Sequence, residues 1–194
     1  MSSPVYGAGS GPARSYTVEG VTAQEAYELT TRGGATDFHR LIDVCESFGS
    51  YCLIGGLAVN CYVEPVYTLD ADLVVIASHL PGLRVRLEEQ GFKAEEHAHS
   101  VNVSAPDSDL RIQFTTDERY QAFPARAADA EVLGVRVRVA CLEDVTRGKL
   151  WAYSDPQSRL SKRKDELDLI RLAEAYPELK SSYPSELQAQ LDRG

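Results

Sequence analysis

The chain has 194 residues, of which 43% are hydrophobic and 25% are charged, a composition typical of one globular domain or of one and a half. No apolar run approaches the roughly 18–20 residues that a membrane-spanning helix needs, so we expect no membrane partner. The net charge of −9 argues against sequence-independent binding of nucleic acid over the whole surface.

The N-terminal segment is predicted to lack regular structure. Its first 15 residues are rich in Gly, Ser and Pro, without the basic region and the apolar stretch of a secretory signal peptide. We therefore predict that residues 1–20 are disordered and that the protein is cytoplasmic. The four cysteines have apolar neighbours and no Cys-x-x-Cys spacing, which predicts buried thiols in a reducing compartment: Cys45, Cys52, Cys61 and Cys141.

Helices and strands alternate in the first half of the chain. A capping box at Thr22-Ala23-Gln24-Glu25 predicts a helix that ends at Gly33-Gly34. A second helix is expected at 37–48, because four apolar side chains share one stripe: Phe38, Leu41, Ile42 and Cys45. The next expected elements are a strand at 51–54, a short helix at 57–63 and a strand at 68–77.

The second half begins with strands and ends with helices. A helix is expected at 81–90, closed by a glycine. Further strands are predicted at 92–97, 101–104, 109–116 and 135–140, and helices at 143–153, at 164–175 and from about residue 185. This order predicts an α/β (α+β) fold with a core at residues 21–140 and a helical C-terminal region at residues 141–194.

Two carboxylates on one predicted strand point to chemistry. Asp70 and Asp72 are two residues apart, so their side chains share one face of the strand, with Cα atoms roughly 6.5–7 Å apart. Like charges this close repel each other unless a cation lies between them, and Mg²⁺ prefers such oxygen ligands. Gly55-Gly56, at a strand-to-helix turn just upstream, could present backbone N–H groups to a phosphate. The segment therefore predicts phosphoryl or nucleotidyl transfer.

This pattern resembles the nucleotidyltransferase superfamily that includes DNA polymerase beta, in which a Gly-Gly or Gly-Ser turn, a short helix and an Asp-x-Asp strand follow one another. The nearer resemblance is to AbiEii-type bacterial nucleotidyltransferase-like proteins, whose Lys-Asp-x-x-Asp element matches Lys164-Asp165-Glu166-Leu167-Asp168. The likeness covers about residues 36–180. It implies a mixed sheet flanked by helices, with a nucleoside triphosphate as substrate and Mg²⁺ as cofactor.

The resemblance also implies roles for single residues. Asp70, Asp72 and Lys149 are the expected catalytic residues, since the ammonium group of Lys149 could neutralise a triphosphate. Nucleotide binding is assigned to five residues: Gly55, Gly56, Thr68, Lys164 and Asp168. The third carboxylate of the family is replaced by Gln113, which can ligate Mg²⁺ through its amide oxygen but cannot act as a general base.

Structural readings of the same residues stay open. Lys149 could be a surface lysine, and Lys164 and Asp168 could form an ordinary i,i+4 ion pair. Thr68 could serve only as a strand former. Trp151 is expected to anchor the core rather than to stack on a base.

Two functions compete at this level. In the first, a nucleoside monophosphate is transferred from an NTP to a hydroxyl group of tRNA, protein or a small molecule, in a toxin–antitoxin setting with an antitoxin partner. In the second, the chain is a catalytically reduced relative that binds a nucleotide or a partner protein. Gln113 is the feature that favours the second function.

Overall fold

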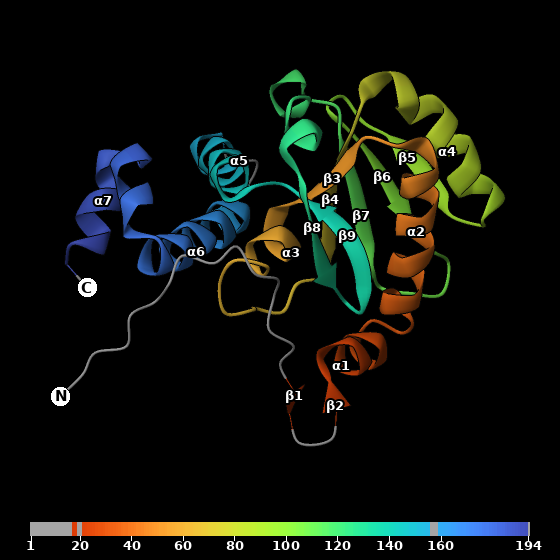
Figure 1. Cartoon of the computed structure of the whole chain (residues 1–194), viewed down its shortest axis with the longest axis horizontal. Helices are drawn as coiled ribbons and strands as arrows, with labels where there is room; N and C mark the ends of the chain where they lie inside the picture. The colour runs from red at the N-terminus through yellow and green to blue at the C-terminus, as the bar shows by residue number, and fades with distance from the viewer. Residues whose placement is uncertain (1–16, 19–20, 156–158, 194) are drawn as a thin grey trace.

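The computed structural model describes residues 17–18, 21–155 and 159–193, so the predicted disorder of residues 1–20 lies almost entirely outside the described part. Figure 1 shows a central sheet with helices on both faces. The helices on one face are α2 (Gly34–Phe48) and α4 (Leu80–Glu89). Those on the other face are α3 (Gly55–Val59), α5 (Leu142–Ser154) and α6 (Arg159–Ala175).

The sheet has seven strands in the spatial order β5-β6-β7-β4-β3-β9-β8. Two neighbouring pairs, β3 with β9 and β4 with β7, are parallel, and the other pairs are antiparallel. The predicted mixed sheet flanked by helices is thus confirmed. The strands are β3 (Tyr51–Ile54), β4 (Asp70–Val75), β5 (Lys93–Glu96), β6 (Ser100–Ser104), β7 (Arg111–Thr115), β8 (Ala128–Val132) and β9 (Val135–Val139).

Shorter elements connect and extend this framework. The N-terminal ones are β1 (Thr17–Val18), β2 (Val21–Thr22) and α1 (Ala23–Thr30). Short 3₁₀ turns are η1 (Ala77–His79), η2 (Glu118–Tyr120), η3 (Phe123–Arg126) and η4 (Pro177–Ser182), and α7 (Ser185–Leu191) follows the last of them. The predicted capping box is present, since the Thr22 hydroxyl accepts from the backbone N–H of Glu25 and the Glu25 carboxylate accepts from that of Thr22.

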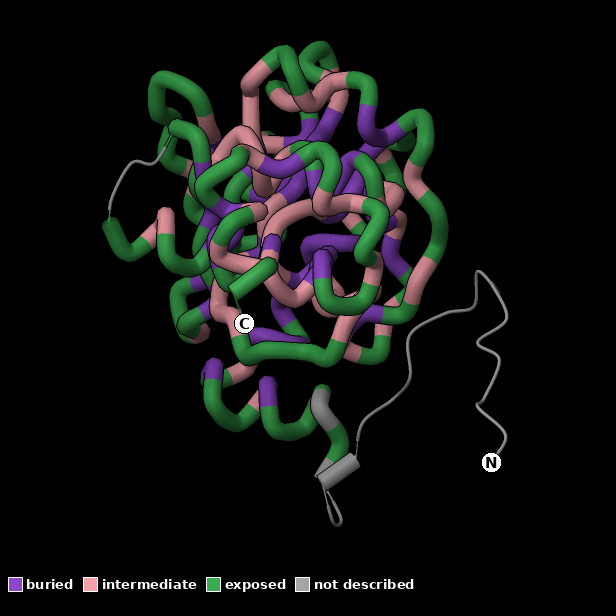
Figure 2. The backbone as a smooth tube through the Cα atoms, turned by 90° about the vertical axis from the view of Figure 1, so that its left-hand side faces the viewer, coloured by how far each residue is buried: buried purple, intermediate pink, exposed green. Residues whose placement is uncertain are grey.

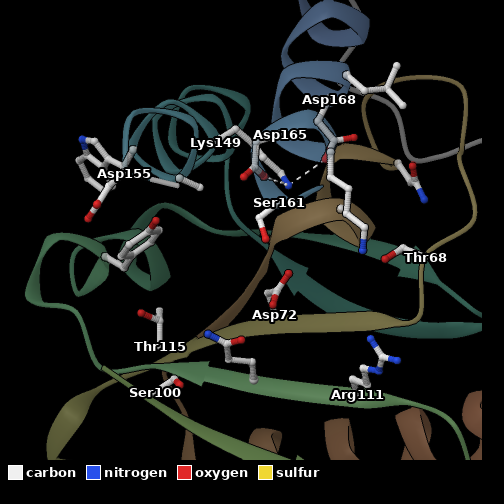
Figure 3. A pocket seen from close by; sticks show the side chains of 18 of the residues that line it. Thr68, Asp72, Ser100, Arg111, Thr115, Lys149, Asp155, Ser161, Asp165 and Asp168 are labelled. Carbon is white, nitrogen blue, oxygen red and sulfur yellow. Dashed lines mark hydrogen bonds and ion pairs between the residues drawn. The ribbon is translucent and has the colours of Figure 1, made fainter. Parts of the chain in front are cut away.

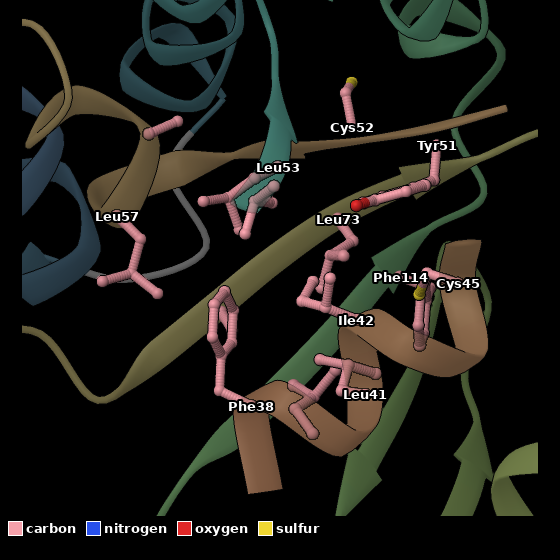
Figure 4. Close-up of a cluster of buried hydrophobic side chains, with 14 of the residues drawn as sticks. Phe38, Leu41, Ile42, Cys45, Tyr51, Cys52, Leu53, Leu57, Leu73 and Phe114 are labelled. Atoms are coloured by element: carbon pink, nitrogen blue, oxygen red, sulfur yellow. The ribbon is translucent and has the colours of Figure 1, made fainter. Parts of the chain in front are cut away.

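The main core lies between α2 and the sheet. The predicted apolar stripe of α2 is buried, and Figure 4 shows its side chains facing Leu53, Leu73 and Phe114 of the sheet. Each fully buried apolar side chain of this size contributes roughly 1.5–3 kcal/mol. Because Leu73 points to this core, the alternation of β4 turns Asp70 and Asp72 towards the opposite face. The core thereby sets the direction of both carboxylates.

The helical C-terminal part shares this core and adds a second cluster. Val145 and Leu172 belong to the main cluster, together with the sheet residues. The smaller cluster joins α5, α6, η4 and α7 through Tyr153, Leu169, Ala173, Tyr183 and Leu187. Figure 2 shows the buried segments gathered inside the molecule, with exposed segments around them. The division into residues 21–140 and 141–194 stays a prediction.

Several boundaries differ from the sequence prediction. The helix α3 begins at Gly55 rather than at 57 and ends four residues earlier than predicted, and α6 begins at Arg159 rather than at 164. The strand β8 escapes the prediction because its sequence, Ala-Asp-Ala-Glu-Val, has little apolar signal. It lies at an edge of the sheet and most of its side chains are exposed, so its place depends on pairing with β9.

The four cysteines differ in how deeply they are buried. All four cysteines are free; Cys45 and Cys52 are buried, whereas Cys61 and Cys141 are only partly buried. The prediction of buried thiols is therefore correct for two of them. Among the described residues, no helix combines the length and the apolar character that a membrane crossing requires.

Candidate active site

A cleft of about 750 Å³ separates the sheet from α5 and α6 (Figure 3). Asp72 lies in the middle of its floor, Thr68 and Arg111 lie towards one end, and Ser100 and Thr115 towards the other. Seven of the predicted site residues line it: Gly56, Thr68, Asp72, Gln113, Lys149, Lys164 and Asp168. Gly55 borders a smaller adjoining cavity of about 190 Å³. Asp70 does not line the cleft itself, but its two cationic neighbours, Arg111 and Lys164, do.

The two acids of β4 lie side by side with residues of the neighbouring strand β7. Asp70 is in register with Arg111, and Asp72 is in register with Gln113. The burial of β4 alternates, with Asp70 and Asp72 more exposed than Ala71 and Leu73, so both acids share one face as predicted. The amide of Gln113 therefore stands at the position beside Asp72 at which a third ligand was expected.

The glycine turn is shaped by Asp72. Gly55 has φ +69°, and a Cβ atom there would lie 2.0 Å from Oδ2 of Asp72. Only a glycine fits both the backbone conformation and the approach of this carboxylate. Gly56 has more room, since its Cβ would meet Thr68 at 3.6 Å. Glycine is therefore required at position 55 because of the close approach of Asp72 and the positive φ. Gly56 is not constrained in this way and lines the cleft.

Thr68 fixes the start of the carboxylate strand. Its Oγ1 accepts a hydrogen bond of 3.2 Å from the backbone N–H of Asp70. Thr68 also lines the cleft, and its hydroxyl donates no hydrogen bond to any of the described residues, so the proton is available to a ligand. A role in shaping the strand and a role in binding are therefore compatible at this position.

Asp72 is an aspartate held in an unfavourable environment. It forms no hydrogen bond or ion pair with any residue in the described ranges, although Lys149 and Lys164 act on it electrostatically. Burial raises the pKa of Asp72 to about 6, with smaller upward contributions from Asp70 and Asp165 and opposing ones from the two lysines. A carboxylate that is desolvated and left without a partner is typical of functional sites.

Asp70 is contacted by two exposed cations. Nζ of Lys164 lies 3.5 Å from Oδ2 of Asp70, and Nη1 of Arg111 lies 3.9 Å from Oδ1. Both distances are long, and the two basic side chains are 61% and 74% exposed, so they can turn towards another anion at little cost. Lys164 does not form the i,i+4 pair with Asp168. Arg111 was outside the sequence-based site, because only the parallel pairing of β4 with β7 brings it beside Asp70.

Lys149 lies in the helical wall but is already paired. Its Nζ is 2.8 Å from Oδ1 of Asp165 and 2.8 Å from Oδ2 of Asp168, and its side chain is only 11% exposed. Burial alone would lower the pKa of Lys149, but Asp168 and Asp165 outweigh burial and the net shift is upward. The reading of Lys149 as a surface lysine is therefore wrong. Its charge is balanced by two carboxylates, so direct neutralisation of a triphosphate is not its evident role.

The same network reaches the loop between α3 and β4. Oδ1 of Asp168 is 2.7 Å from Nη1 of Arg171, and Nη2 of Arg171 donates to Oδ1 of Asn60 at 2.9 Å and to the carbonyl of Glu64. The carboxamide of Asn60 in turn bonds the backbone of Val66 at 2.7 and 3.0 Å. The sequence analysis assigned no role to Arg171 or Asn60. The signal that could have identified Arg171 is its position one helical turn after Asp168.

Trp151 lines the cleft and is contacted by three neighbouring side chains. Phe123 stacks on it at 5.8 Å between ring centroids, and the guanidinium group of Arg119 lies 5.1 Å from its centroid. Tyr120 meets its edge at 5.1 Å. These contacts support the prediction that Trp151 anchors packing.

The donor set fits one hard divalent cation. Among the described residues, no group of three or more Asp, Glu, His or Cys side chains is arranged to hold a metal ion. Two carboxylates on one face and the adjacent amide of Gln113 are nevertheless oxygen ligands of the type that Mg²⁺ accepts together with waters and phosphates. The unpartnered carboxylate of Asp72 is the observation that supports this fit.

Solved nucleotidyltransferase structures are similar to this chain. The solution structure of the antibiotic-resistance factor ANT(2'')-Ia is 16% identical with a TM-score of 0.57, over 82% of this chain and 91% of that one. The crystal structure of ANT(2'')-Ia in complex with adenylyl-2''-tobramycin has a TM-score of 0.54 at 16% identity, over 82% and 97% of the two chains.

A third similar structure comes from Paracoccidioides brasiliensis and is an antigenic nucleotidyltransferase-like protein. It has a TM-score of 0.50 at 21% identity, over 82% of this chain and 86% of that one. No protein-family model matches the chain, and no curated protein matches it. Likeness at these identities shows the fold, and the AbiEii type stays a prediction. The chain therefore has the nucleotidyltransferase fold.

Proposed function

We propose that this chain transfers a nucleoside monophosphate from a nucleoside triphosphate to a hydroxyl group of an acceptor. The observation that carries the proposal is the set around Asp72: an unpartnered carboxylate, a second acid on the same face and the amide of Gln113 on the next strand. This set lies on the floor of a cleft large enough for a nucleotide and a second small molecule. The shared fold supports the same reaction class.

Asp70, Asp72 and Gln113 would hold Mg²⁺. When bound, Mg²⁺ neutralises phosphate charge and polarises the phosphoryl oxygens. Lys164 and Arg111 are free to leave their long contacts with Asp70 and to bind the phosphates instead. Gly56 lets the backbone approach the phosphates, and Thr68 can donate its hydroxyl proton to them.

Lys149 and Asp168 support the site from the helical wall. Lys149 of α5 pairs with Asp165 and Asp168 of α6. These ion pairs hold the two helices together and so position Lys164, which lies on α6 next to Asp165. In the reaction the acceptor oxygen bonds to the α-phosphorus while the bond to the pyrophosphate oxygen breaks. Pyrophosphate leaves, and the hydroxyl proton passes to water in the open cleft, since Gln113 cannot accept it.

The acceptor that we propose is a small molecule. ANT(2'')-Ia was crystallised with adenylyl-2''-tobramycin, an adenylylated small molecule, and has the same fold. The net charge of −9 disfavours a tRNA acceptor, because the phosphate backbone would be repelled. A protein acceptor, an antitoxin partner and the toxin–antitoxin setting stay predictions of the sequence resemblance.

The test is transfer of label from NTPs labelled at the α-phosphate. The protein is incubated with Mg²⁺, each of the four NTPs and separate panels of small hydroxyl compounds, total tRNA and protein, and pyrophosphate release is measured in parallel. We expect label on a small molecule, and loss of transfer to background in Asp70→Asn. The matched control is Asp129→Asn, which removes an exposed acid of β8 away from the cleft and should leave transfer unchanged.

A catalytically reduced relative is the second candidate, favoured by Gln113 at the position of a third acid. In that case Mg²⁺-dependent NTP binding persists, but no panel receives label and no pyrophosphate is released. The Gln113→Asp variant sharpens the distinction, because it restores the missing acid and should create measurable pyrophosphate release. Absence of any NTP binding would contradict the first candidate and the nucleotide-binding form of the second.

A further inference from the structure

Three apolar side chains lie exposed in the lining of the cleft, at the end marked by Thr68. They are Val66, Tyr67 and Leu167, which are 44%, 58% and 48% exposed. Val66 and Tyr67 directly precede Thr68, and Leu167 follows Lys164 by three residues on the same side of α6. Two walls of the cleft therefore contribute apolar surface, and each of them also carries a side chain proposed to bind phosphate, Thr68 in the loop and Lys164 on α6.

This surface is held in place before any ligand arrives. The ring of Tyr67 packs on the buried ring of Tyr27, with centroids 5.9 Å apart and the planes tilted by 47°. The loop that carries Val66 is closed by its two hydrogen bonds with Asn60, and Arg171 anchors Asn60 to α6 at 2.9 Å. A surface preorganised in this way costs little to order when it binds.

Two of the polar side chains beside this surface, Asn60 and Arg171, are already engaged. Both ends of the Asn60 carboxamide are used by Val66 and Arg171, and Arg171 is also paired with Asp168. The remaining exposed area is therefore suited to a flat, apolar group rather than to a hydroxylated one. A nucleobase has such a face, and it is joined through the ribose to the phosphates that Lys164 and Arg111 would bind.

We propose that Tyr67, together with Val66 and Leu167, forms the binding site of the nucleobase. This inference rests on the proposed function and deepens it, because it assigns one end of the cleft to the nucleotide and leaves the end near Ser100 and Thr115 to the acceptor. Every base can stack on an aromatic ring, so this site should discriminate only weakly among the four bases. Trp151, another aromatic side chain in the lining, is already engaged with Phe123, Tyr120 and Arg119.

The test compares two probes by calorimetry in the presence of Mg²⁺: ATP, and inorganic tripolyphosphate, which has no base. We expect Tyr67→Ala to weaken ATP binding by about 5- to 150-fold, the range of base–aromatic stacking by alanine substitution. Binding of tripolyphosphate should change by less than about twofold. Tyr67→Phe keeps the ring and should bind ATP as the wild type does. Tyr67 is exposed, so its truncation should leave folding intact.

A second variant pair tests the other wall. Leu167→Ala should weaken ATP binding less than Tyr67→Ala does, whereas Leu160→Ala, an exposed leucine on the same helix outside the cleft lining, should have no effect. The inference is overturned if Tyr67→Ala binds ATP like the wild type, or if ATP and tripolyphosphate weaken together. If the wild type binds neither probe, the proposed function fails as well, and this outcome differs from the other two.

Discussion

Three aspartates of α5 and α6 have close cationic partners, whereas the two aspartates of β4 do not. On α5 and α6, Asp144 is held by Arg126 and Arg147 at 2.8 and 3.2 Å, while Asp165 and Asp168 share Lys149. On β4, Asp72 has no partner among the described residues. Asp70 has only two long contacts to exposed cations.

This difference separates acids that stabilise the fold from acids that cost stability. A buried acid with a good partner holds two elements together, and its loss leaves the partner unsatisfied. An acid without a partner persists where a function requires it, because nothing in the folding energy favours it. The comparison therefore assigns a structural role to Lys149 with Asp165 and Asp168, and in the function proposed above the chemistry falls to the two aspartates of β4.

The largest effect should come from removing the shared cation of the helical wall. Lys149→Met leaves Asp165 and Asp168 buried without their central partner, and we expect a loss of about 3–5 kcal/mol in the free energy of unfolding. Lys164→Met, which alters a 61% exposed side chain of α6, should change stability by less than about 1 kcal/mol. Urea denaturation measures both. Equal stabilities of the two variants would contradict the structural role assigned to Lys149.

The second effect concerns the fit between Gly55 and Asp72. Gly55→Ala places a Cβ atom 2.0 Å from the Asp72 carboxylate at a residue with φ +69°, and we expect a loss of roughly 2–4 kcal/mol. Adding Asp72→Ala to this variant should restore part of the loss, because it removes the clash. A fully additive double mutant would show that the two residues do not touch.

Replacing the acids themselves should move stability in opposite directions. Asp144→Asn breaks charged hydrogen bonds with Arg126 and Arg147 and should cost about 1–3 kcal/mol. Asp72→Asn removes an uncompensated charge and should stabilise the metal-free protein at pH 7. The pKa of Asp72 is raised from 3.8 to about 6, and this shift limits the stabilisation by Asp72→Asn to roughly 3 kcal/mol. Thermal unfolding with a chelator present tests both.

The pH dependence follows from the same shift. Because the folded protein holds the Asp72 proton more tightly than the unfolded chain does, the penalty of Asp72 is complete above about pH 6 and disappears as the pH falls towards 4. The stability advantage of Asp72→Asn should therefore shrink over this range. An advantage that is constant from pH 7 to pH 4 would contradict the assigned pKa.

The smallest effect is expected for the exposed cations. Arg111→Gln removes one long ion pair with Asp70 and should leave the free energy of unfolding within about 0.5 kcal/mol of the wild type. The same variant should weaken Mg²⁺-dependent binding of tripolyphosphate by about 2- to 5-fold, since it removes one of the proposed phosphate ligands. Arg136→Gln, an exposed arginine paired with Asp129 on β8 and β9, serves as the control.

Local patterns in the sequence predicted the parts of this protein that depend on near neighbours. The stripe of α2, the capping box at Thr22 and the common face of Asp70 and Asp72 all follow from helix and strand periodicity, which the backbone imposes over a few residues. The need for glycine at position 55 was visible as a turn, but its cause, the Asp72 carboxylate 17 residues later, was not.

The sequence by itself determined the order of most elements, the core-facing stripe of α2 and the common face of Asp70 and Asp72. Only the tertiary structure decided which charges remain free. The partners of Lys149 lie on the next helix, and Arg111 reaches Asp70 through the pairing of two parallel strands. Ion pairs between distant segments depend on how helices and strands pack, and packing brings together residues whose separation along the chain carries no local signal.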